Sequence, residues 1–84
     1  MTKPSKLRDM NDPGIQEFAT QIGDTVRTAR MLTNTTQVEL AKKVGIHPVY
    51  LSNIETGYEI PSLPLLYHVI TSVGLRLKLE LRPK

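Results

Sequence analysis

Side chains that could carry out catalysis are sparse in this sequence of 84 residues. There is no cysteine, and the two histidines, His47 and His68, do not belong to any pattern of metal ligands. No pair of carboxylates, no nucleophile beside a base and no glycine-rich phosphate loop is recognisable. We therefore expect a protein that is not an enzyme and that needs neither a cofactor nor a metal ion.

The excess of positive charge lies at one end of the chain. The formal net charge is +3, and Lys3, Lys6 and Arg8 lie in the first eight residues without an acidic neighbour. From Asp9 onward eight basic residues are balanced by the eight acidic ones. Bulk charge supports only non-specific attraction to nucleic acid, so any interface must be argued from where individual charges lie.

The length predicts a single small domain. A chain of 84 residues buries roughly 60% of its unfolded surface, so a second subunit would add useful stability, and we expect a dimer. The sequence has no apolar run of about twenty residues, no signal-peptide pattern and no cysteine. These features predict a cytoplasmic protein.

The first part of the chain predicts a tail followed by a long helix. Residues 1–11 are polar and basic and lack apolar periodicity, which favours a flexible tail. Asp12 and Pro13 are typical of an N-cap and a first helical position. The helix should extend to about Leu32. Its apolar residues recur at helical spacing: Ile15, Phe18, Ala19, Ile22, Val26 and Ala29.

Two short helices should follow, separated by a tight turn. Thr36 and Glu39 fit a capping box at the start of a helix over residues 37–44. Gly45 suits the left-handed conformation that ends a helix. A third helix should begin near His47, with Pro48 in its first turn and Leu51 and Ile54 directed inward, and should stop at residues 56–57.

A fourth helix and a strand complete the predicted elements. Ser62 can cap a helix that ends at Gly74 and buries one stripe, formed by Leu63, Leu66, Val69, Ile70 and Val73. Residues 75–82 alternate leucine with charge, which predicts a strand with one apolar face. Since no second strand of similar quality exists in the sequence, its partner should come from another chain.

The segment QVELAKKVGIHPVYLSNIET, residues 37–56, resembles the helix-turn-helix of the phage repressor and Cro family. The apolar positions of the segment, its small residue Ala41 and its turn glycine Gly45 all match the pattern of this family. The resemblance implies a mainly α, lambda-repressor-like fold of four to five helices. A basic tail (1–11) would precede a DNA-binding domain (12–74), and a dimerisation strand (75–84) would follow it.

This resemblance also implies DNA contacts, residue by residue. Gln37 would reach a phosphate, and Lys42 and Lys43 match phosphate contacts or solvated surface charges. The positions that face the base edges or the flanking backbone are His47, Pro48, Val49, Tyr50, Ser52 and Asn53. Arg30 and Glu55 match an ion pair that orients the third helix in this family. The partner would be double-stranded operator DNA.

The added C-terminal strand resembles the arrangement in HipB-type antitoxins, where this strand pairs across a homodimer. The resemblance implies that Leu75, Leu77, Leu79 and Leu81 form the dimer interface; pairing within the chain or with a toxin remains the alternative. The implied function is a transcriptional repressor, either an antitoxin that controls its own operon and holds a kinase-like toxin or a stand-alone phage-type repressor. A transcriptional activator is a third possibility.

Overall fold

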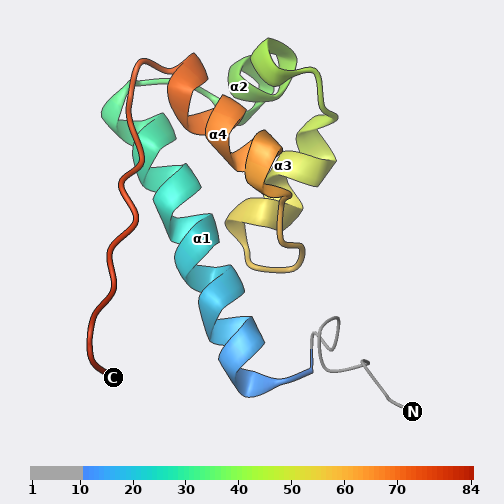
Figure 1. Ribbon diagram of the computed structural model, residues 1–84. Helices are drawn as coiled ribbons and strands as arrows, with labels where there is room; N and C mark the ends of the chain where they lie inside the picture. The colour runs from blue at the N-terminus through green and yellow to red at the C-terminus, as the bar shows by residue number, and fades with distance from the viewer. Residues whose placement is uncertain (1–10) are drawn as a thin grey trace.

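The computed structural model describes residues 11–84, so the expected flexible tail, apart from Asn11, lies outside the described residues. Within this range the chain forms a bundle of helices joined by short turns (Figure 1). The helices described are α1 (Pro13–Leu32), α2 (Gln37–Val44), α3 (Pro48–Glu55) and α4 (Leu63–Ser72). The mainly α expectation is thereby confirmed.

Each helix begins at a side chain that caps its first turn. Asp12 accepts hydrogen bonds from the N–H groups of residues 14 and 15, and Ser62 accepts one from residue 65. Thr36 and Glu39 form the expected capping box, with both reciprocal hydrogen bonds present. These caps satisfy backbone donors that a helix cannot pair internally. The predicted starts of all four helices are confirmed.

Two left-handed residues set the turns around α2. Asn34, with φ of 55°, lies in the turn that leaves α1, and Gly45, with φ of 77°, ends α2. Asparagine and glycine are the residues that adopt this region at least cost. Asn34 therefore fills a turn position that suits its residue type.

The core lies where the four helices meet. α3 packs on α1 and α2, and α4 packs on the same two helices. The cluster of buried apolar residues draws on every helix and contains Val26, Ala29, Leu40, Ala41, Leu51, Ile54, Leu66, Val69 and Ile70. The stripes predicted for α3 and for most of α4 are thus found in the core.

Phe18 and Leu63, both predicted on apolar stripes, are exposed. Leu63 is 75% exposed, which contradicts its expected burial, and Phe18 is 58% exposed. Leu63 is the first residue of α4 and is exposed, whereas Pro61 in the preceding loop is buried. The apolar periodicity of a helix continues to both of its ends. The neighbouring elements that would cover the apolar face do not extend that far.

The C-terminal segment is extended and unpaired in the single chain. No strand occurs among residues 11–84, so the predicted strand is not formed within one chain. Leu75 packs against the core, whereas Leu79 and Leu81 are 80% and 101% exposed. In Figure 1 this segment lies to the left of α1, while α3 lies to its right. No helix in the described range is long and apolar enough to cross a membrane.

Gly23 allows an unusually close approach between α1 and the end of α3. A Cβ atom placed on Gly23 would lie 2.5 Å from the carbonyl oxygens of both Ile54 and Glu55. These are backbone atoms, which cannot move aside as a flexible side chain would. The absence of a side chain at position 23 therefore determines how closely α3 packs on α1.

We expect Gly23→Ala to lower the free energy of unfolding by about 1–3 kcal/mol, because overpacking outweighs the gain in helix propensity. Gly14→Ala is the matched control in the same helix, since its Cβ would meet only the Asp12 side chain, at 3.2 Å. Urea denaturation of both variants measures the difference. A Gly23→Ala protein as stable as the control would contradict the close approach.

Candidate nucleic-acid interface

The turn between α2 and α3 fixes how α3 is presented. Ala41 of α2 is fully buried in the same core cluster as Leu51 and Ile54 of α3, so a larger side chain there would disturb the packing of the two helices. The N–H of Ile46 donates to the carbonyl of Ala41 at 3.0 Å, which closes α2 beside Gly45. Leu51 and Ile54 hold the inner face of α3 in the core. The opposite face of α3 is consequently left at the surface.

The residues predicted to face the base edges differ in exposure. His47 is exposed, Val49 is 60% exposed, and Ser52 and Asn53 are half-buried. Pro48 is half-buried, and Tyr50 packs against the core. The accessible surface of α3 therefore consists chiefly of His47, Val49, Ser52 and Asn53. Tyr50 instead packs against the core and helps to hold the helix in place.

The His47 side chain caps the start of α3. Its Nδ1 accepts a hydrogen bond from the N–H of Val49 at 3.1 Å. A ring nitrogen that accepts carries no proton, so the neutral imidazole has its proton on Nε2. The exposed ring consequently offers an N–H donor to its surroundings.

Asn53 is held by a residue that the sequence analysis did not identify. Its Nδ2 donates to Glu59 Oε2 at 3.2 Å, and its backbone carbonyl accepts from the N–H groups of Tyr58 and Glu59. A carboxylate only accepts, which fixes the orientation of the Asn53 amide. Glu59 thus places a negative charge beside the face of α3, and no sequence motif marks it.

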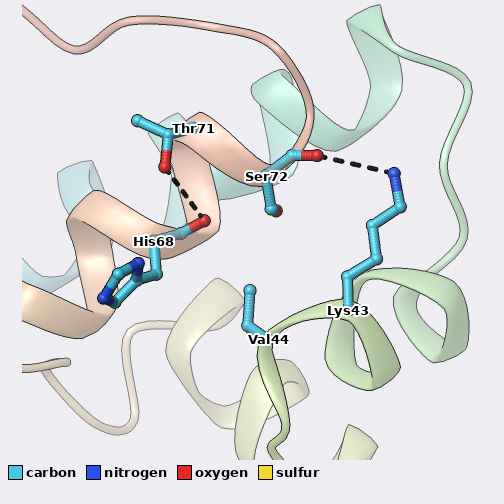
Figure 2. A pocket seen from close by; sticks show the side chains of 5 residues that line it. All are labelled: Lys43, Val44, His68, Thr71 and Ser72. Carbon is cyan, nitrogen blue, oxygen red and sulfur yellow. Dashed lines mark hydrogen bonds between the residues drawn. The ribbon is translucent and has the colours of Figure 1, made fainter.

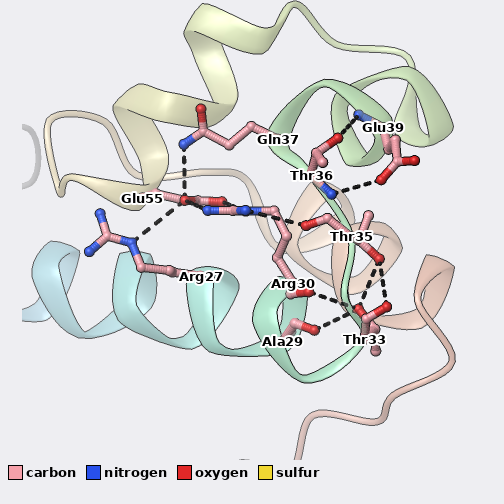
Figure 3. Close-up of polar contacts among 9 residues, drawn as sticks. All are labelled: Arg27, Ala29, Arg30, Thr33, Thr35, Thr36, Gln37, Glu39 and Glu55. Atoms are coloured by element: carbon pink, nitrogen blue, oxygen red, sulfur yellow. Dashed lines mark hydrogen bonds and ion pairs between the residues drawn. The ribbon is translucent and has the colours of Figure 1, made fainter.

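A buried carboxylate joins α1, α2 and α3 (Figure 3). The Glu55 side chain is fully buried, and Arg30 binds it through two hydrogen bonds, from Nε at 2.8 Å and from Nη2 at 2.9 Å. This paired geometry is the strong form of an arginine–carboxylate contact. The structure therefore brings together the two residues that were expected to form an ion pair.

Two further residues complete this cluster. Gln37 Nε2 donates to Glu55 Oε1 at 3.1 Å, and Arg27 Nε lies 3.7 Å from the same oxygen. Gln37 was expected to contact phosphate, but its side chain is already engaged with Glu55. Arg27 was not identified from the sequence, although it lies one turn before Arg30 and so on the same side of α1.

The surroundings of Glu55 stabilise its charged form. Burial alone would raise the pKa of this carboxyl, but hydrogen bonds from Arg30 and Gln37, and the charges of Arg30 and Arg27, hold the pKa below its ordinary value. The same contact raises the pKa of Arg30. Both groups therefore remain ionised in the folded protein around neutral pH.

The two lysines of α2 lie at its C-terminal end, away from the N-terminus that carries Gln37. Figure 2 shows Lys43 reaching across an open pocket to α4, where its Nζ contacts the Ser72 carbonyl at 3.5 Å. This pocket is also lined by Val44, His68 and Thr71. Lys42 is exposed and lines a second hollow with Asn34 and Glu39. Lys43 therefore contacts α4 and is not among the residues that line the exposed face of α3.

The described residues contain no cluster of three or more histidine, cysteine, aspartate or glutamate side chains that could hold a metal ion. His68 makes an edge contact with the ring of Tyr67. The residues that shape this interface but escaped the sequence analysis are Gly23, Arg27 and Glu59. A glycine within a helical pattern was the one available signal, because such a glycine often marks a close contact.

We expect the stability of the protein to fall in acid partly because of Glu55. Its pKa is lowered by folding, so its contribution is fully present above the unfolded carboxyl value, about 4.3, and is lost as the pH falls through the folded value. Glu55→Gln should remove this part of the pH dependence of the unfolding free energy.

Glu39→Gln is the matched control, because folding also lowers the pKa of Glu39, through its hydrogen bonds with Thr36, but its carboxylate is exposed. Solvent screens such a group, so its replacement should change the acid slope less. Urea denaturation between pH 3 and 7 tests both variants. Equal slopes for the wild type and Glu55→Gln would show that the buried pair does not control acid stability.

We expect His47→Ala to lower the unfolding free energy by about 0.5–2 kcal/mol, the usual cost of losing an N-cap. His47→Ser should restore most of it, since a serine hydroxyl can accept the same N–H. Urea denaturation at neutral pH measures both changes. If all three proteins were equally stable, the Nδ1 contact would have no capping role.

Comparison with known proteins extends these observations. A family model described as helix-turn-helix matches residues 26–69. The chain is 33% identical over 60 residues to antitoxin HipB of Escherichia coli O6:H1 and 32% identical over 60 residues to antitoxin HipB of Escherichia coli K12. No solved structure matches the chain significantly.

The alignments with these antitoxins cover 71% of this chain and 64% and 68% of the two relatives, so the chain spans about two thirds of their length. The matched model covers more than half of the 84 residues and contains α2 and α3 with the turn between them. The chain therefore belongs to the helix-turn-helix family and is a HipB-like member of it.

Proposed function

We propose that this chain is a transcriptional regulator that binds double-stranded operator DNA by placing α3 in the major groove. The observation that carries the proposal is the presentation of α3: its inner face is fixed by the core and by Glu55, while His47, Val49, Ser52 and Asn53 line its accessible face. A major groove about 12 Å wide accepts a helix presented in this way.

These side chains suit different parts of a base pair. Asn53 can bond adenine through its amide, and Val49 can contact a thymine methyl. His47 and Ser52 supply hydrogen bonds to a base edge or to the backbone. Direct readout by so few polar groups is limited, so the shape of the DNA should contribute to specificity.

The N-terminus of α2 should receive a phosphate. The N–H groups of a first helical turn have no partner within the helix and attract anions. The amide of Gln37 carries two protons, of which Glu55 engages one, so the other is available to the same phosphate. Lys42, at the other end of α2, would contact a different phosphate, whereas Lys43 contributes less because it contacts α4.

A homodimer should present two copies of α3 to adjacent half-sites about one DNA turn apart. We propose that the segment 75–82 forms its interface as a strand shared between the subunits. The exposure of Leu79 and Leu81 and the lack of a partner strand within residues 11–84 support this assignment. The proposal also includes an attraction of the basic residues Lys3, Lys6 and Arg8 to DNA. It further includes a cytoplasmic location.

The similarity to two proteins named antitoxin favours a second role for the same chain. We propose that it also holds a toxin and that DNA binding controls the operon of the pair. A stand-alone repressor would need only the DNA-binding surface. Co-purification with the product of the neighbouring gene distinguishes these two functions.

DNA binding is tested by titration with a fragment that carries the promoter of the gene, at two salt concentrations. The wild type should prefer this fragment over an unrelated one, with an affinity that falls steeply as salt increases. The double variant Ser52→Ala with Asn53→Ala should lose the preference, at a cost of about 1–3 kcal/mol for each base contact removed.

Thr71→Ala is the matched control, because Thr71 is exposed on α4 and its hydroxyl bonds only its own helix. Its promoter preference should equal that of the wild type. If wild-type protein bound the two fragments equally at both salt concentrations, specific DNA recognition by α3 would be refuted.

We expect the double variant Leu79→Ser with Leu81→Ser to remain folded and become monomeric, because both leucines are exposed in the single chain. Light scattering across a concentration series measures the association. Val38→Ser, which replaces a 63% exposed side chain on α2, is the control and should stay dimeric. A dimer of unchanged stability in the leucine variant would exclude this segment as the interface.

A further inference from the structure

We propose that Glu59 is a specificity-determining residue, which holds the Asn53 amide in the orientation that reads adenine and weakens binding to DNA in general. The inference rests on the DNA binding of the proposed function and names the base that Asn53 reads. Glu59 acts through Asn53 and contacts no base itself, so it is a positioning residue. The operator that it favours has adenine at the position that Asn53 reaches.

The loop after α3 places Glu59 beside Asn53 through its backbone. The N–H groups of Tyr58 and Glu59 donate to the Asn53 carbonyl at 2.8 Å and 3.2 Å. The Thr56 hydroxyl donates to the same oxygen at 3.2 Å. These contacts fold the loop back onto the last turn of α3. The position of Glu59 is therefore set by hydrogen bonds in which its side chain takes no part.

Gly57 packs the same loop on α1. Its φ of +82° lies in the left-handed region, and a Cβ atom placed on it would lie 3.2 Å from the backbone N and Cα of Thr20. A residue with a side chain would be strained here both by this φ and by the contact. The loop is thus held by α1 as well as by α3, which gives Glu59 a defined place in the folded chain.

The carboxylate of Glu59 selects one orientation of the Asn53 amide. Asn53 Nδ2 donates to Glu59 Oε2 at 3.2 Å. A carboxylate cannot donate, so an amide turned by half a rotation would place its oxygen against a negative charge. Adenine also requires one orientation, with Oδ1 accepting from N6 and Nδ2 donating to N7. Because Nδ2 carries two protons, one can stay on Glu59 while the other binds N7.

This contact should strengthen when DNA covers it. In the free protein Asn53 is half-buried and Glu59 is exposed, so water competes for both groups. A DNA interface excludes part of this water and lowers the local dielectric constant, which strengthens a hydrogen bond to a charged acceptor. The amide is therefore held most firmly in the complex, where its orientation decides which base is bound.

The charge of Glu59 acts in the opposite direction on total affinity. Phosphate groups line both sides of the major groove, and they repel a carboxylate whatever the bases are. This penalty lowers the affinity for all sequences alike, whereas the gain through Asn53 is confined to sites with adenine. Glu59 therefore reduces total affinity and raises the ratio of specific to non-specific binding.

The test compares full-length Glu59→Gln with the wild type on the promoter fragment and on an unrelated fragment, by fluorescence anisotropy. Glutamine keeps the shape, loses the charge and both donates and accepts, so either orientation of Asn53 finds a partner. Binding to the unrelated fragment should tighten by roughly two- to five-fold, the scale of a surface charge interaction. The promoter preference should fall by roughly five-fold, the lower end of what a bidentate base contact contributes.

A double-mutant cycle with Asn53→Ala separates a positioning role from a direct one. In the Asn53→Ala protein there is no amide to release, so adding Glu59→Gln should tighten binding to both fragments equally and leave their ratio unchanged. If Glu59→Gln lowered the preference by the same factor with and without Asn53, the carboxylate would contact a base itself. That result would overturn the positioning role.

The base is identified with a promoter fragment in which an analogue with carbon in place of N7 replaces adenine. The analogue still pairs with thymine, but it cannot accept from Asn53 Nδ2. On this fragment the wild type and Glu59→Gln should show the same reduced preference. A wild-type preference that survived the replacement would overturn the assignment of adenine to Asn53.

Glu17→Gln is the matched control, because Glu17 is exposed on α1 and its carboxylate contacts Gln21 of the same helix. It removes one negative charge and should leave the promoter preference unchanged. Tighter binding of Glu59→Gln to the unrelated fragment would also show that this variant is folded. A wild-type preference in Glu59→Gln would overturn the inference and leave the proposed function intact. If the wild type itself had no preference, both would be wrong.

Discussion

Burial of the Glu55 carboxylate is the constraint on which the placement of α3 depends. An ionised carboxylate without partners would be costly in this site, so it must be surrounded by donors. Arg30 supplies two hydrogen bonds from α1, and Gln37 supplies a third from the first turn of α2. Glu55 also lies at the C-terminal end of α3, where the helix dipole disfavours a negative charge, and the arginines of α1 offset this effect. One side chain thus ties the helix that presents the interface to both helices beside it.

The ion pair and Gly23 act together. The bidentate contact has a fixed geometry, so it can form only if the end of α3 lies at the right distance from α1. Gly23 permits this distance, because its missing side chain leaves room for the Ile54 and Glu55 carbonyls. Attraction and close packing therefore specify the same position of α3. This agreement explains how a helix of eight residues, too short to be stable alone, can present a defined surface.

Local features of this fold were readable from the sequence, whereas contacts across the fold were not. The ends of the helices depend on neighbouring residues such as Asp12, Thr36 and Gly45, so the predicted boundaries agree with the structure. The exposure of Leu63 depends on which elements cover α4, and the contact of Glu59 with Asn53 depends on the path of a loop. The contact of Gly23 with α3 joins residues about thirty positions apart. Periodicity contains no information about such distances. The C-terminal segment is a further case, because in the proposed dimer its partner belongs to another chain.

The shared strand of the proposed dimer would connect dimerisation with the spacing of the DNA half-sites. The C-terminal segment and α3 lie on opposite sides of α1 in Figure 1, so pairing of the segment need not cover the face of α3. Moving the two-fold axis by one residue slides one strand by two residues relative to the other, about 6.8 Å at the usual rise of a strand. This distance corresponds to roughly two base pairs of DNA. The register in which the two segments pair would therefore also fix which half-site separation the two copies of α3 can reach. In this arrangement a segment that contacts no base still selects among operators.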